Sequence, residues 1–147
     1  MTRKLFSAVA VAVLLSAGCF SVTRQSGPTA LGQSLSGNWT SFSSGSIQDN
    51  CTNFTWAVTQ YNGNSASGTF GALCYGFLQV NGTASATLTS ASSASWTVAA
   101  NASGPGVPSV CAISISGTAT ITATNIVIPY SGTSCLGPLS GVETLKR

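Results

Sequence analysis

Apolar and polar residues alternate along most of the chain after residue 37, and no part of that stretch has the 3.6-residue period of a helix. Alternation with a period of two is typical of strands with one buried face. The pattern therefore predicts a single all-β domain over residues 37–147. The expected strands cover 38–42, 52–61, 65–73, 77–88, 94–100, 113–121, 126–130 and 141–146.

The first clear hairpin is centred on Asn62-Gly63, because this dipeptide between two alternating runs is the strongest short-range hairpin signal. Cys51 and Cys74 lie equally far from the dipeptide on either side. A chain that folds back at this turn brings the two cysteines together. We therefore expect a disulfide across the open end of the hairpin.

A second segment repeats this arrangement between Cys111 and Cys135, with a polar turn near 123–125. The two cysteine spacings, 24 and 23, differ by one residue. Of the three connectivities that four cysteines allow, this similarity favours Cys51–Cys74 and Cys111–Cys135. Each bridge is expected to stabilise the fold by roughly 3 kcal/mol on the chain-entropy model.

The apolar pattern predicts the register of both hairpins. A two-residue turn at Asn62-Gly63 would place Trp56 opposite Thr69, whereas a pairing shifted by one residue makes one face entirely apolar. Because a one-residue shift turns a whole strand over, burial should select the apolar register, with the slack taken up near the cysteines. The predicted pairs are Trp56–Phe70, Phe54–Ala72, Val58–Gly68, Ile121–Ile126 and Gly117–Tyr130.

The N-terminus has the features of an export signal. Arg3-Lys4 precedes an apolar stretch over residues 5–15 that is too short to be a convincing membrane span. Residues 15–19, Leu-Ser-Ala-Gly-Cys, resemble the lipobox of bacterial lipoproteins, in which cleavage before the cysteine is followed by acylation of its thiol. The resemblance implies a signal peptide over 1–18 and a lipid on Cys19.

Cleavage after Ala17 by an ordinary signal peptidase is the alternative. We favour lipidation, because setting Cys19 aside leaves four cysteines that can pair completely in an oxidising compartment. Residues 19–36, rich in Ser, Gly, Gln and Thr, are then a flexible tether between the lipid and the domain.

The number and spacing of the strands predict an antiparallel up-and-down barrel of about eight strands (lipocalin-like) or a two-sheet β-sandwich. Four short motifs also occur in a broad group of small secreted bacterial lipoproteins, which this chain resembles. That resemblance implies the fold and an envelope location, and no established activity. The motifs are Gly37-Asn38-Trp39, Gln60-Tyr61-Asn62-Gly63, Ser131-Gly132-Thr133-Ser134-Cys135 and Leu145-Lys146-Arg147.

Charge and composition exclude several classes of protein function. Charged residues make up 5% of the chain, the net charge is +3, and all five cations lie near the two ends. No basic patch is expected in the domain, so nucleic-acid binding has no electrostatic basis. The chain has no His, and its carboxylate side chains are Asp49 and Glu143. We therefore expect no enzyme, no metal site and no cofactor.

Two carboxylates and a set of aromatic residues are the remaining candidates. Asp49 is most simply a turn or capping residue. Glu143 shares a strand face with Leu145 and could point into a barrel, but we favour a solvated Glu143, with Val142 and Thr144 inward, because an unpaired buried Glu is rare. Trp39, Trp56, Phe70, Trp96, Tyr130 and Glu143 are the residues that could line a ligand pocket.

A packed core is the more common role of such aromatic residues, and we favour it. Gly and Ala on the inner faces nevertheless leave room that Leu or Ile would fill, and eight strands enclose space for one small ligand at most. Asn-x-Ser/Thr triplets are glycan acceptors in eukaryotic secreted proteins, so a eukaryotic secreted glycoprotein is a further alternative for this chain. These triplets begin at Asn38, Asn50, Asn53, Asn81 and Asn101.

Two functions remain after these exclusions. The first is a monomeric cell-envelope lipoprotein, anchored in the outer membrane by an N-terminal lipid, whose domain binds a small apolar ligand or a partner. The second is a structural or adhesive surface domain without a ligand. A secreted protein without an anchor is the alternative location. An interior cavity bordered by Trp56, Trp96 and Tyr130 would favour a ligand.

Overall fold

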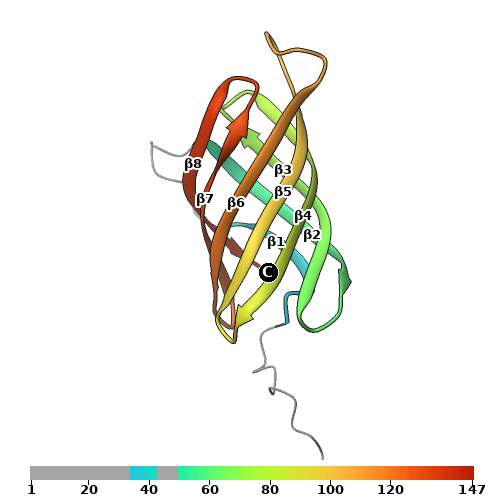
Figure 1. Ribbon diagram of the computed structural model, residues 1–147, viewed down its shortest axis with the longest axis vertical. Helices are drawn as coiled ribbons and strands as arrows, with labels where there is room; N and C mark the ends of the chain where they lie inside the picture. The colour runs from blue at the N-terminus through green and yellow to red at the C-terminus, as the bar shows by residue number, and fades with distance from the viewer. Residues whose placement is uncertain (1–33, 43–49) are drawn as a thin grey trace, which may run out of the picture.

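The structure is a computed structural model that describes residues 34–42 and 50–147, and within them it contains eight strands and no helix. The strands are antiparallel and follow one another around a closed barrel in chain order (Figure 1). The prediction of an up-and-down barrel is confirmed, and the two-sheet sandwich is excluded. The strands are β1 (Gly37–Ser41), β2 (Cys51–Tyr61), β3 (Ser65–Cys74), β4 (Leu78–Ser90), β5 (Ser93–Ser103), β6 (Cys111–Ile121), β7 (Asn125–Ser134) and β8 (Gly137–Lys146).

Burial alternates along the strands as the sequence pattern predicts. In β5, every second residue from Ala94 to Ala102 is buried and the residues between are mostly exposed. β4 runs through Gly82 without a break. The inward side chains of all eight strands form one core, and the outward side chains are mainly Ser, Thr and Asn.

Three strand boundaries differ from the prediction by three residues or more, and one of them is the end of β7, at Ser134 instead of 130. β5 continues to Ser103, because Asn101 and Ala102 keep pairing with Asn81 and Val80 of β4, so the loop begins at 104. β8 begins at Gly137 instead of 141, and Leu139 continues its buried face. Leu35, within the expected tether, is also buried and packs against the core.

The predicted register of the first hairpin is confirmed at its centre. Trp56 lies opposite Phe70 and Val58 opposite Gly68, whereas the pair Cys51–Cys74 is one residue out of step with them. The shift falls between Thr52 and Thr55, where Asn53 has a φ of 55°. The one-residue register shift that reconciles the cysteine pair with the central pairs therefore lies next to the cysteines, as predicted.

The apolar register predicts a three-residue loop over 62–64, but the observed turn of this hairpin is shorter. A second register shift lies between Val58 and Gln60, and the Asn62 N–H donates to Ser65 O over 3.1 Å. Gly63 and Asn64 are thus the central turn residues. Gly63 has a φ of 86°, as the first central position of a type II′ turn requires.

The second hairpin and both disulfides also agree with the sequence. Ile121 pairs with Ile126 and Gly117 with Tyr130. Cys51 is bonded to Cys74 and Cys111 to Cys135. Each bridge therefore closes its own hairpin.

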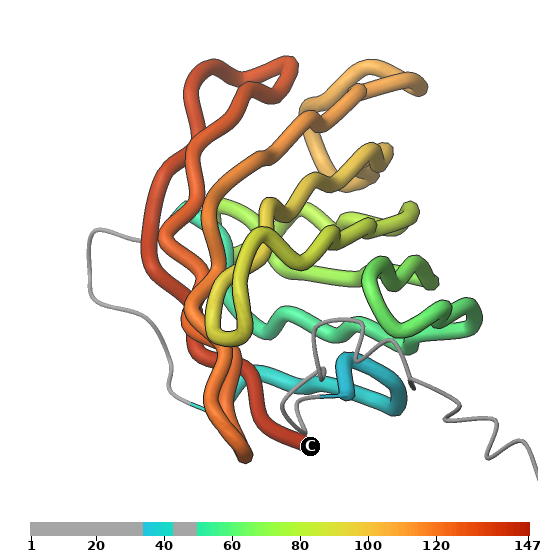
Figure 2. Tube along the Cα trace, turned by 60° about the horizontal axis from the view of Figure 1, so that its bottom comes forward, coloured from blue at the N-terminus to red at the C-terminus, as the bar shows by residue number. Residues whose placement is uncertain are grey.

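The two ends of the barrel differ. Both disulfides lie at the end that holds the β3–β4 turn, the β5–β6 loop and the β7–β8 turn, which we call the loop end. At the other end the chain enters β1 and leaves β8, together with the β2–β3, β4–β5 and β6–β7 turns. Figure 1 shows the β5–β6 loop in orange at the top and the entry to β1 near the bottom, and Figure 2 shows the same barrel turned.

Candidate functional site

The interior aromatic residues form one cluster around Phe54. Its ring lies 5.1 Å from that of Phe70, 5.3 Å from Tyr130 and 6.0 Å from Trp96, measured between ring centroids. Phe70 and Trp96 are 5.7 Å apart. These distances and their tilted or stacked orientations are typical of packed aromatic pairs. Phe54, which the sequence analysis treated only as a register residue, is the centre of the group.

The rings of this cluster are buried, and so is Trp56, which lies opposite Phe70. Phe54 is 0% exposed, and Trp56 and Trp96 are each 1% exposed. A side chain that borders an internal void wide enough for water would keep surface in contact with that void. These three residues therefore have almost no surface that could border such a void.

The inward glycines do not leave the room that the sequence suggested. A Cβ atom on Gly68 would overlap the carbonyl oxygen of Ala57, and one on Gly117 would overlap that of Pro129. The backbone of the neighbouring strand occupies the space at these positions. Gly117 also lies between Trp96 and Tyr130 on the adjacent strands. Close strand approach beside a large ring explains these glycines better than a ligand does.

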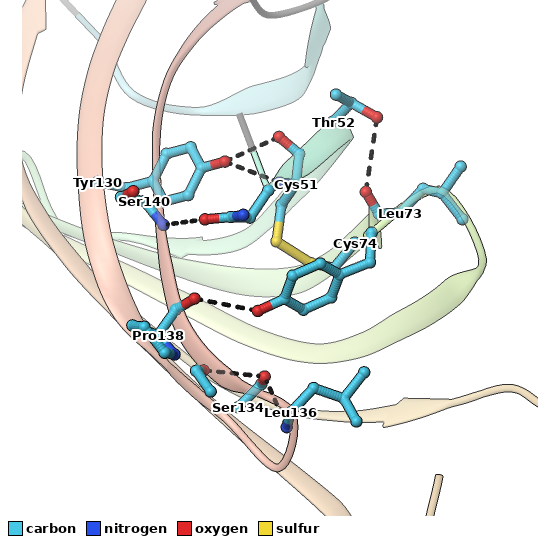
Figure 3. Close-up of a disulfide and its surroundings, with 12 residues drawn as sticks. Cys51, Thr52, Leu73, Cys74, Tyr130, Ser134, Leu136, Pro138 and Ser140 are labelled. Carbon is cyan, nitrogen blue, oxygen red and sulfur yellow. Dashed lines mark hydrogen bonds between the residues drawn. A yellow bond between two sulfur atoms is a disulfide. The ribbon is translucent and has the colours of Figure 1, made fainter. Parts of the chain in front are cut away.

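Tyr130 ties β7 to the start of β2 across the barrel. Its hydroxyl accepts from the Cys51 N–H and donates to the Cys51 carbonyl oxygen, each over 2.9 Å (Figure 3). Both hydrogen bonds are buried. The hydroxyl thus has a structural role beside the first disulfide.

Trp39 lies opposite Trp56 of β2 and near the terminal end. Its indole N–H donates to Leu35 O over 2.9 Å, and the Arg147 guanidinium lies 4.5 Å from the ring centroid. The Leu35 carbonyl and the Arg147 guanidinium thus cover the Trp39 ring where the chain enters the barrel. Trp39 therefore packs with the terminal segments and is 0% exposed.

Two polar groups inside the barrel lack protein partners among the described residues. The indole nitrogens of Trp56 and Trp96 are buried, and no described acceptor lies within hydrogen-bond distance. A buried N–H without an acceptor costs free energy relative to a paired one.

Glu143 is buried, and the expectation that it is solvated is wrong. Its exposed fraction is 0%, whereas that of Val142 is 51%. The face shared with Leu145 points inward because Leu139 and Leu145 continue the same apolar alternation. Burial of the apolar residues thus sets the orientation of the whole strand and brings the carboxylate inside.

Ser41, which is half-buried, gives Glu143 a partner at the junction of β1, β2 and β8. The Ser41 hydroxyl donates to Glu143 Oε1, and its oxygen accepts from the Phe54 N–H over 2.6 Å. One hydroxyl therefore links three strands where β1 ends. Nothing in the sequence pattern distinguishes Ser41 from the many other Ser residues, so its role was not predictable from the sequence.

The outer face of β2, β3 and β4 has two shallow hollows. One, of about 420 Å³, lies beside the β2–β3 turn and is lined by residues that include Gln60, Tyr61 and Thr87. The other, of about 270 Å³, lies near Thr55, Gly71 and Asn81. Both are lined by hydroxyl and amide groups together with a somewhat smaller share of apolar surface. Neither has a charged lining residue.

Other candidates add no chemistry. Within 34–42 and 50–147, no three His, Cys, Asp or Glu residues lie close enough together to hold a metal ion. Asp49 and Cys19 lie outside the described residues. The described part of the chain contains no helix that could cross a membrane.

Comparisons of the chain with protein-family models, with curated proteins and with solved structures found no match.

Proposed function

We propose that this chain is a non-catalytic cell-envelope module that acts through the surface of a packed barrel and does not enclose a ligand. The aromatic cluster around Phe54 is the observation that carries this proposal. Trp56 and Trp96 were expected to border a cavity if a ligand were bound, yet both are 1% exposed. Close packing of the rings supports a core that stiffens the barrel.

An extracytoplasmic location is part of the proposal. Two disulfides are typical of proteins that fold in an oxidising compartment. The N-terminal signal and the cysteine at residue 19 suggest attachment through an acyl chain. The chain enters the barrel at the end opposite both disulfides, so an anchor at residue 19 would leave the loop end free.

A small apolar ligand in the barrel is the second candidate function. The observation in its favour is the pair of indole nitrogens, on Trp56 and Trp96, without a described acceptor. A ligand with a polar group between two apolar ends could accept from them. Such a ligand would have to displace rings that now touch one another.

Ligand screening separates the two functions. We expect native mass spectrometry of the purified protein to give the mass of the chain, with any N-terminal lipid and no further adduct. We also expect no change in thermal midpoint across a panel of fatty acids, sterols and aromatic compounds. A co-purified hydrophobe would overturn the packed-barrel proposal, as would a saturable midpoint shift that Trp96→Phe abolishes.

A further inference from the structure

The two disulfides differ in their access to solvent. We call Cys51–Cys74 the first bridge and Cys111–Cys135 the second bridge. Both cysteines of the first bridge are 0% exposed. In the second bridge, Cys111 is also 0% exposed, whereas Cys135 is an exposed residue. Of the four bridged cysteines, Cys135 is therefore the one that a small molecule in solution reaches while the barrel stays closed.

Hydrogen bonds enclose the first bridge. Cys51 and Cys74 form a pair within the ladder of β2 and β3. Tyr75, next to Cys74, donates its N–H to Asn50 O over 2.6 Å. The Tyr130 hydroxyl binds the Cys51 backbone from across the barrel (Figure 3). A thiol can reach either sulfur of this bridge only after these contacts break and the strands separate.

The second bridge lies beyond the end of its own ladder. On this side of the barrel the pairing of β6 with β7 ends at Ser114–Thr133. Cys135 lies in the β7–β8 turn itself. Cys111 pairs with Ala102 of β5 on its other side. Opening of the second bridge therefore removes no strand pair, and the barrel can stay closed.

The β7–β8 turn also has hydrogen bonds of its own. The Ser134 hydroxyl donates to Gly137 O and accepts from the Leu136 N–H, each over 3.1 Å. Just beyond the turn, the Tyr75 hydroxyl donates to Pro138 O over 3.0 Å. These bonds hold the turn without the second bridge, so a reagent at Cys135 meets an ordered segment.

We propose that Cys135 is a site of thiol–disulfide exchange, at which a dithiol reductant opens the second bridge while the first bridge stays closed. A thiolate of the reductant attacks Cys135 Sγ, the S–S bond breaks, and its electron pair leaves on Cys111 Sγ, which takes up a proton. The second thiolate of the reductant then displaces Cys135, which takes up a proton in turn. The reductant is oxidised to its disulfide. The β5–β6 loop is then no longer tied to the β7–β8 turn.

Timed thiol labelling tests the order of reduction. The full chain carrying Cys19→Ala, which keeps only the bridged cysteines, is incubated with dithiothreitol under native conditions. Samples are quenched with acid, and free thiols are labelled with N-ethylmaleimide in denaturant for intact-mass analysis and peptide mapping. We expect labels on Cys111 and Cys135 to appear at least about tenfold faster than labels on Cys51 and Cys74, because the first bridge reacts only after local opening. The far-UV circular dichroism of the doubly labelled species should remain that of the oxidised barrel.

The unfolded chain is the matched control. In guanidinium chloride both bridges are accessible and should be reduced at similar rates. Glutathione, a monothiol, locates the attack in the folded chain, because its mixed disulfide should form on Cys135. Reduction of the first bridge before or together with the second would overturn the proposal, as would an equal preference for the second bridge in guanidinium chloride. Glutathione on Cys111, or loss of the barrel signal with the first two labels, would overturn it as well.

Discussion

At the scale of single residues, Ser41 links strands that few other contacts join. β1 has five residues, and it pairs with β8 at Thr40–Lys146 and Ser41–Leu145. The Ser41 hydroxyl adds contacts to Glu143 and to the Phe54 N–H at this junction. It satisfies two buried polar groups at once.

Ser41→Ala should therefore destabilise the barrel by about 1–3 kcal/mol, because both groups lose this partner inside the protein. Thr40→Ala, on the outward face of the same strand, is the control and should change stability by less than about 0.5 kcal/mol. Urea unfolding followed by tryptophan fluorescence measures both variants. Equal midpoints for Ser41→Ala and the unsubstituted chain would show that the junction does not need the hydroxyl.

Glu143 and the inward glycines show where residue-level prediction failed. Glu143 was expected in solvent on the general rarity of buried carboxylates, but the apolar residues of β8 fix its side of the strand. The apolar alternation of β8 predicts the orientation of Glu143 better than the general rarity of buried carboxylates does. The contact of Gly68 with the backbone of β2 involves the coiling of the strands around the barrel, which no alternation pattern contains.

At the scale of elements, the hairpins were predictable because two signals agree in each. Alternating apolar residues select one register, and the cysteines constrain the open ends. The observed one-residue shift between Thr52 and Thr55 reconciles the two signals. The position of the β2–β3 turn was less predictable, because a second shift beyond Val58 leaves the central pairs unchanged.

Each disulfide should stabilise the barrel, since each closes a loop of similar length. Replacing Cys51 and Cys74 together by Ala is expected to lower the free energy of unfolding by roughly 3 kcal/mol. The double replacement of Cys111 and Cys135 should have a similar effect. Guanidinium unfolding under non-reducing conditions measures both, and the oxidised unsubstituted chain is the reference.

The matched control is the same pair of measurements after reduction of every protein. The reduced unsubstituted chain should then unfold near the Ala variants. A bridge whose removal leaves the midpoint unchanged would contradict this prediction for that hairpin. Peptic peptides that link Cys74 to Cys111 would contradict the pairing itself.

At the scale of the whole molecule, the barrel separates its two ends. The chain enters at the terminal end, where Leu35 packs against the core and Arg147 covers Trp39. The disulfides lie at the loop end. Sequence could place the strands in order, but the contact between the β3–β4 turn and the start of β8, where the Tyr75 hydroxyl donates to Pro138 O, depends on barrel closure.

The membrane anchor is the property that the sequence implies for the molecule as a whole. In a bacterial host, the unsubstituted chain should sediment with the membrane fraction, and Cys19→Ala should release it to the soluble extracytoplasmic fraction. A single acyl chain binds membranes weakly, so stable attachment needs the further acylation that lipoprotein processing supplies. Mass spectrometry of the N-terminal peptide should show the lipid on residue 19.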